Sequence, residues 1–214
     1  VRYVFAHWSG ASSSTNPSVT ITVDGPKTLT AVWKTQYYLT VDNGGHGTVS
    51  GEDWYDADTQ ATVSISPTQI ESGNTRYVFT TWLGAVTSTD DTITITMNAP
   101  KTVRAVWKTQ YKVIVLSDYG TVTLSPAAPN NWYDEDTDIV ISLTDTPYVM
   151  GATRYVFAGW SGDATGSKTS ISITVDAPKS VSALWSVEYL LTVDNNGHGS
   201  LTITPQGDNN WYPN

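Results

Sequence analysis

The feature that most constrains the fold of this chain is an internal repeat marked by tryptophan. A block that begins Arg-Tyr-Val-Phe and ends Trp-x-Gly starts at residues 2, 76 and 154, so the repeat length is 74 and then 78 residues. Self-similarity at such a period indicates tandem copies of one structural unit. All nine tryptophans fall into three sets of equivalent positions, which are Trp8, Trp82 and Trp160; Trp33, Trp107 and Trp185; and Trp54, Trp132 and Trp211.

Within each copy, apolar residues alternate with Thr and Ser. Ile93, Ile95 and Met97 share one face of an extended segment, as do Val103, Ala105 and Trp107. This period of two predicts half-buried strands, and no segment carries a sustained 3.6-residue pattern. We therefore expect an all-β fold, built from tandem β-grasp-like or β-sandwich-like modules of about 75 residues in an elongated array. The tryptophans at positions 8 and 33 and their equivalents are predicted to be core residues.

Turn residues separate the predicted strands. The sequence Asp-Asn-Gly-Gly at 42–45 suits the tip of a first hairpin. The sequence Ala-Pro-Lys at 99–101 suits a hairpin between the last two strands of a copy.

The repeat also sets the expected module boundaries. Residues 1–36 are expected to be the C-terminal half of a module, 37–110 and 111–188 full modules, and 189–214 the N-terminal half of a module. The full copies place a predicted strand between the Trp-Tyr pair and the next Arg-Tyr-Val-Phe block, and the two half-modules together lack it. Two explanations stay open. The chain is a stretch of a longer array, or the half-modules of neighbouring molecules complete each other by strand addition and form a head-to-tail filament.

Composition excludes several functions. The net charge is −9 and the pI is about 4.5, so nucleic acid and anionic membranes are not expected partners. The chain has no cysteine, and no stretch is long and apolar enough to insert into a membrane. An acidic, Thr-rich β protein of this kind fits a secreted or cell-surface location.

Two blocks carry a resemblance to a known family. The blocks "RYVFTTWLG" at 76–84 and "PKTVRAVW" at 100–107, with their copies, resemble the divergent internalin B-repeat family. The resemblance covers essentially the whole chain and implies small β modules strung along secreted prokaryotic surface proteins, with no catalytic residues. The acidic loops "WYDADT" and "WYDEDT" depart from the family pattern, as does the last Trp of each copy, where the family more often has Phe.

One candidate for chemistry is the acidic Asp-x-Asp loop. Asp56 and Asp58, and their equivalents Asp134 and Asp136, could supply some of the six to eight oxygens that calcium takes. The alternative is a turn whose carboxylates cap backbone N–H groups. No other cofactor is expected. Catalysis is not expected either, because no nucleophile elbow or phosphate loop is present and the acidic pairs recur in successive copies.

The recurring Trp-Tyr pairs are the second candidate. Exposed Trp and Tyr rings can stack on sugars, so a carbohydrate-binding module that takes cell-surface polysaccharide is one interpretation. Packing at the end of the core or contact between modules is the favoured interpretation. The arginines at 2, 76 and 154 are expected to serve as ion-pair or cation–π partners of nearby rings. The pairs are Trp54 and Tyr55, Trp132 and Tyr133, and Trp211 and Tyr212.

Together these patterns predict a non-catalytic, extracellular structural repeat protein. A stalk, an adhesin, and a filament or sheath component of a prokaryotic cell surface are the roles that we expect. The partner would be the chain itself, in a longer array or a head-to-tail polymer.

Overall fold

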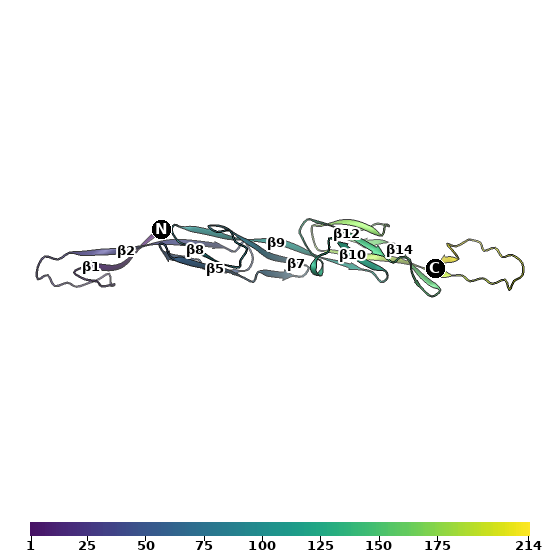
Figure 1. The fold of residues 1–214 in the computed structure, drawn as a ribbon, viewed down its shortest axis with the longest axis horizontal. Coiled ribbons are helices and arrows are strands. Elements are labelled where there is room, and N and C mark those ends of the chain that lie inside the picture. The colour runs from purple at the N-terminus through teal and green to yellow at the C-terminus, as the bar shows by residue number, and fades with distance from the viewer. The chain divides into compact units, whose positions relative to one another are not determined.

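The computed structural model describes all 214 residues and contains strands with no α-helix (Figure 1). Contacts divide the chain into two units. Unit 1 contains Val1–Glu71 and Tyr77–Lys108, and unit 2 contains Ser72–Arg76 and Thr109–Asn214. The prediction of an all-β fold is confirmed. Each unit is a β-sandwich, because its core lies between two sheets and no helix packs on either of them. The structure contains no helix that could span a membrane.

The elements are β1 (Arg2–Gly10), β2 (Leu29–Asp42), β3 (Thr48–Ser50), β4 (Asp53–Asp56), β5 (Gln60–Ser66), β6 (Gln69–Ser72), β7 (Thr75–Gly84), β8 (Thr92–Thr96), β9 (Lys101–Leu116), β10 (Thr121–Ser125), the 3-10 turn η1 (Pro129–Asn131), β11 (Trp132–Asp134), β12 (Thr137–Thr144), β13 (Tyr148–Met150), β14 (Thr153–Gly162), β15 (Ser170–Val175), β16 (Lys179–Leu190) and β17 (Trp211–Pro213).

Unit 1 has a main sheet around the long strand β2 and a smaller second sheet. β1 and β4 pair antiparallel with β2, and β9 pairs parallel with it from Leu39 opposite Lys101 to Asp42 opposite Arg104. β7 pairs with β9. The second sheet has the order β3-β5-β8.

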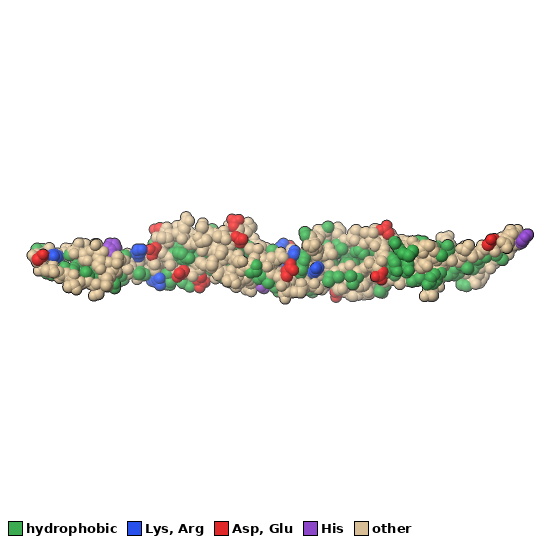
Figure 2. Space-filling view, turned by 90° about the horizontal axis from the view of Figure 1, so that it is seen from below, with side chains coloured by type: hydrophobic (Ala, Val, Ile, Leu, Met, Phe, Trp, Pro, Cys, Tyr) green, Lys and Arg blue, Asp and Glu red, His purple; other side chains and the backbone are tan.

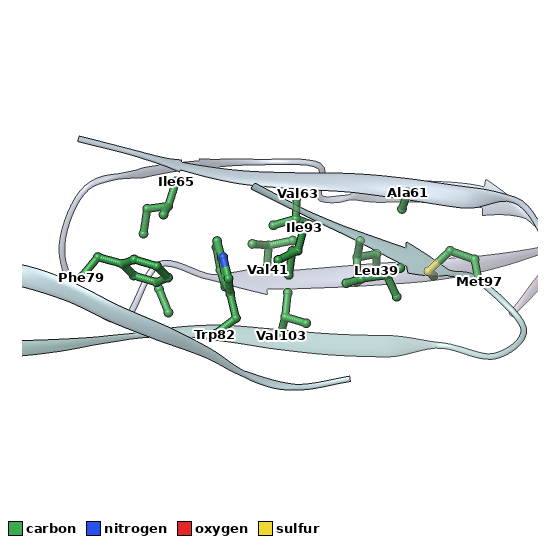
Figure 3. Packing of buried hydrophobic residues seen from close by; sticks show 12 residues of the cluster. Leu39, Val41, Ala61, Val63, Ile65, Phe79, Trp82, Ile93, Met97 and Val103 are labelled. Atoms are coloured by element: carbon green, nitrogen blue, oxygen red, sulfur yellow. The ribbon is translucent and has the colours of Figure 1, made fainter. Parts of the chain in front are cut away.

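The core of unit 1 lies between these two sheets. Figure 3 shows Trp82 and Val103 rising from the main sheet toward Val63 and Ile93 of the second sheet. The alternation read from the sequence is visible in β5 and β8, where every second side chain is buried. The apolar face of each sheet therefore covers that of the other.

Unit 2 repeats the plan. β9 pairs with β11 antiparallel and with β16 parallel, β14 joins β16 antiparallel, and β10-β12-β15 form the second sheet. Its core holds Trp160, Tyr133 and the apolar side chains of β12. The same sequence pattern thus gives the same two-layer core in both units.

The structure corrects both hairpin predictions. The turn at residues 42–45 leads from β2 to β3, and β3 pairs with β5 instead of β2. The turn at 99–101 leads from β8 in the small sheet to β9 in the main sheet. Because the strands on either side of each turn face a common core, both turns are arches between layers and not hairpins within one sheet.

Trp33 is a further correction, because it was predicted to be buried and is 57% exposed. Its equivalents Trp107 and Trp185 pack against the two cores. In unit 1, the ring of His46 lies edge-on to Trp107 at 5.7 Å, and residues 1–36 contain no counterpart of His46 or of β5. Trp33 keeps its contact with Phe5 at 5.8 Å and lacks the rest of this cover.

The two equivalent tryptophans provide a matched test of one buried hydrogen bond. Trp107 Nε1 donates to the Asn43 carbonyl at 2.8 Å, whereas the buried Trp185 Nε1 has no partner. We expect Trp107→Phe to lower the free energy of unfolding by about 1 kcal/mol more than Trp185→Phe, since only the first loses a hydrogen bond. Urea unfolding, with hydrogen exchange as the readout for each unit, measures the loss of stability in both variants. Equal losses in the two variants would contradict the prediction.

Candidate functional site

The recurring Trp-Tyr pairs lie on three short strands that pair in the same way with a long strand. In β4, β11 and β17 the tyrosine is opposite a tyrosine of the long strand. The tryptophan, which precedes it in the chain, is opposite the next residue of the long strand. The tyrosine pairs are Tyr55 with Tyr37, Tyr133 with Tyr111, and Tyr212 with Tyr189. The long strand also pairs with the strand that begins with the block arginine, as β1 and β14 show. Arginine and tryptophan are thereby brought together, and we name each such place an arginine–tryptophan junction.

In the junction of unit 1, the Arg2 guanidinium lies 4.6 Å from the centre of the Trp54 ring. Arg2 Nε donates to Gln36 Oε1 at 2.6 Å, and Gln36 Nε2 donates to Asp56 Oδ1 at 2.7 Å. The glutamine thus connects the cation to a carboxylate and holds the guanidinium over the ring. A cation in this position is attracted by the negative face of the indole.

Asp56 also accepts a hydrogen bond from Lys34 Nζ at 2.8 Å. The contact with Lys34, followed by that with Gln36, lowers the pKa of Asp56. Because folding favours the ionised carboxylate, the stabilisation is present at neutral pH and is lost as the pH falls through the lowered pKa.

In unit 2, the first junction repeats this arrangement with deeper burial. Arg76 lies 4.6 Å from the centre of the Trp132 ring, and its Nε donates to Gln110 Oε1 at 2.6 Å. Gln110 in turn donates to Asp134. Trp132 is only 6% exposed, and the buried Tyr133 donates its hydroxyl to the Pro126 carbonyl at 3.0 Å. Burial raises the pKa of Tyr133.

The second junction of unit 2 has different charges. Arg154 lies 5.1 Å from the centre of the Trp211 ring, and it is bound by Glu188 at 2.6 Å and Asp208 at 2.8 Å. Glu188 stands where the other junctions have glutamine, and Pro213 stands where they have aspartate. The carboxylate has therefore moved from the short strand to the long one. The hydrogen bond from Arg154 to Asp208, with that to Glu188, raises the pKa of Arg154 despite the opposing effect of burial.

The Asp-x-Asp loops form tight turns beside two of the junctions. Asp58 and Asp136 have left-handed backbones, with φ of 64° and 63°, which Asp tolerates better than most residues. Their backbone N–H groups donate to Met97 and Val175 at 2.9 and 3.0 Å. No group of three or more His, Asp and Glu side chains is placed to hold a metal ion. This geometry accounts for the aspartates as turn residues, and calcium binding stays a prediction of the sequence alone.

The sequence interpretation missed the bridging residue at each junction. Gln36, Gln110 and Glu188 carry no motif of their own, so nothing singled them out. The available signal was a paired change. The third copy replaces glutamine by Glu188 and aspartate by Pro213 together. Such a double replacement indicates that the two positions together supply one negative charge near the arginine.

Comparison with known families agrees with this repeated architecture. The family described as the divergent InlB B-repeat domain matches residues 2–36, 37–110 and 113–188. Comparison with curated proteins and with solved structures gives no match. Three matches over most of the chain establish the relationship, and the chain belongs to the divergent InlB B-repeat domain family.

Proposed function

We propose that the chain is a non-catalytic structural segment of a secreted or cell-surface protein, in which arginine–tryptophan junctions couple each repeat to the next. Its role would be that of a stalk, an adhesin, or a sheath or filament component. The observation that carries the proposal is the recurrence of one junction geometry three times, each time between an arginine of one copy and the tryptophan of the following copy.

The backbone at the junctions supports the same role. β2 runs without interruption from residue 29 to residue 42, past the end of the family match at residue 36. Its first part pairs with β1, and its later part pairs with β4. A continuous strand in place of a flexible linker restricts the bending of one copy against the next.

The molecular surface is consistent with a structural segment. On the face shown in Figure 2, acidic and basic side chains lie in small separate groups, and hydrophobic side chains are exposed over part of the surface. A surface of this kind offers no concentrated field for a charged partner.

Removal of the cation tests the coupling. We expect Arg2→Ala to increase amide hydrogen exchange in β1 and β4. The substitution removes both the hydrogen bond from Arg2 to Gln36 and the contact of the guanidinium with the Trp54 ring. Arg104→Ala is the matched control, since Arg104 is an exposed arginine whose ion pair with Asp42 is longer, at 3.4 Å. Unchanged exchange in β1 and β4 of Arg2→Ala would argue against coupling through the junction.

Polysaccharide binding through the Trp-Tyr pairs is the alternative function. In each junction a guanidinium lies over the indole ring, which leaves less ring surface for a sugar. The two proposals separate in a titration. Quenching of tryptophan fluorescence by a cell-surface polysaccharide, lost in Trp54→Ala and Trp132→Ala, would favour binding over coupling.

Head-to-tail assembly is a finer proposal within the structural role. Residues 1–36 expose Tyr3 and Trp33, and residues 189–214 expose Leu191 and Leu201. Pairing of these segments from two molecules would cover apolar surface but would supply no counterpart of β5. Sedimentation of the purified chain at increasing concentration tests it, and a monomer at all concentrations would contradict it.

A further inference from the structure

Three tyrosine rings gather in unit 2 in a way that neither the family match nor the proposed function explains. Tyr119 lies in the turn between β9 and β10, and Tyr155 and Tyr148 face each other across the β13–β14 pairing. The rings of Tyr119 and Tyr155 are stacked, with centres 3.8 Å apart and planes 16° apart. Tyr148 stacks more loosely on Tyr119, at 5.4 Å and 28°.

Neighbouring groups hold the stack in place. Trp185 meets Tyr119 edge-on at 5.5 Å, and the Ser117 hydroxyl donates to the Tyr119 carbonyl at 2.6 Å. A hydrogen bond with Tyr155, followed by burial, raises the pKa of Tyr119 to about 12. The short distance between the ring centres and the nearly parallel planes place the two rings face to face.

We propose that Tyr119 and Tyr155 form a site of oxidative modification, a dityrosine cross-link made by a one-electron oxidant such as a peroxidase with hydrogen peroxide. Each phenol loses one electron and its hydroxyl proton, and the two radicals couple through the ring carbons next to oxygen. One carbon–carbon bond forms, and the hydrogens on those carbons move to the oxygens. The peroxide takes up the two electrons and two protons and becomes two molecules of water.

Face-to-face stacking is the geometry that this coupling needs, because the new bond starts perpendicular to both rings. Prior positioning of the two radicals replaces a bimolecular encounter by an intramolecular one. Tyr148, which is 38% exposed, is the ring of the cluster through which a surface oxidant can draw an electron. The cross-link would close a loop in a chain that has no cysteine for a disulfide.

Unit 1 provides a built-in control for the proposal. There His46 takes the place of Tyr119 and stacks on Tyr77 at 3.8 Å and 19°. The shape of the stack is kept, but imidazole cannot form dityrosine. We therefore expect cross-linking in unit 2 and none at the equivalent place in unit 1.

The test treats the dilute full chain with peroxidase and hydrogen peroxide and analyses the monomer by intact mass, dityrosine fluorescence and fragment mass spectrometry. We expect the monomer to lose the mass of two hydrogen atoms and the link to join Tyr119 to Tyr155. Tyr119→Phe keeps the ring and should abolish the link. Tyr37→Phe, which removes one member of the cross-strand pair with Tyr55, should leave it intact.

A second variant tests for gain of the modification. His46→Tyr places a phenol over Tyr77 and should create an additional link in unit 1. A link that survives in Tyr119→Phe, a link from Tyr119 to Tyr148 instead of Tyr155, or a monomer of unchanged mass would each overturn the assignment. Circular dichroism of every variant before oxidation confirms that the fold is kept.

Discussion

Replacing Trp82 with alanine is expected to lower the free energy of unfolding of unit 1 by about 3–5 kcal/mol. Trp82 is fully buried, and it lies between the main sheet and the β3-β5-β8 sheet with Phe79 at 5.5 Å (Figure 3). Alanine would leave a large cavity that strands of two sheets cannot fill without losing their pairing. A loss of this size is a large share of the stability of a small domain, so partial unfolding of unit 1 at ambient temperature is expected.

Denaturant unfolding with hydrogen exchange in each unit measures this loss. Trp33→Ala is the matched control, since it removes the same ring from a half-exposed site and should cost less than about 1 kcal/mol. Equal effects of the two substitutions would show that the ring of Trp82 is not the centre of the core.

The strands themselves could be predicted, because burial of one face leaves a direct trace in the sequence. The alternating apolar residues of β5 and β8 are the ones that line the core. The assignment of strands to sheets could not be predicted in the same way. A hairpin and an arch between layers use the same turn residues, and they differ only in whether the second strand pairs with the first or lies over it. That choice depends on contacts such as β3 with β5, which local sequence does not encode.

At the junctions, the sequence identified the arginine and the tryptophan and not the residue between them. Large rings and charges repeat conspicuously, whereas Gln36 is one uncharged side chain in a strand. Gln36 is important because β1 and β4 both pair with β2, which places Gln36 between Arg2 and Asp56. The tyrosine stack of unit 2 was missed for a similar reason, since Tyr119 and Tyr155 are far apart in the chain and only the fold brings the turn after β9 against β14.

The glycine that ends each Trp-x-Gly block gives the second large expected effect. Gly84 has φ of +116°, and a Cβ atom there would overlap the Thr102 carbonyl oxygen and lie 3.3 Å from Val103 Cα. Gly10 and Gly162 show the same close approach to Thr28 and Ser180. The glycine therefore lets the end of one strand lie directly against the backbone of the next.

We expect Gly84→Ala to cost more than about 3 kcal/mol in the unfolding of unit 1, because backbone strain adds to a clash with main-chain atoms that cannot rotate away. Gly73→Ala separates the two contributions. Gly73, which belongs to unit 2, also has a positive φ, of +62°, but nothing lies within 4 Å of an added Cβ, so only the strain of about 1–2 kcal/mol should appear, in the unfolding of unit 2. Thermal and urea unfolding of the two variants measure the difference. If Gly84→Ala were no more destabilising than Gly73→Ala, β7 and β9 could move apart at little cost. The geometry that recurs at Gly10, Gly84 and Gly162 would then have to be explained by something other than close backbone packing.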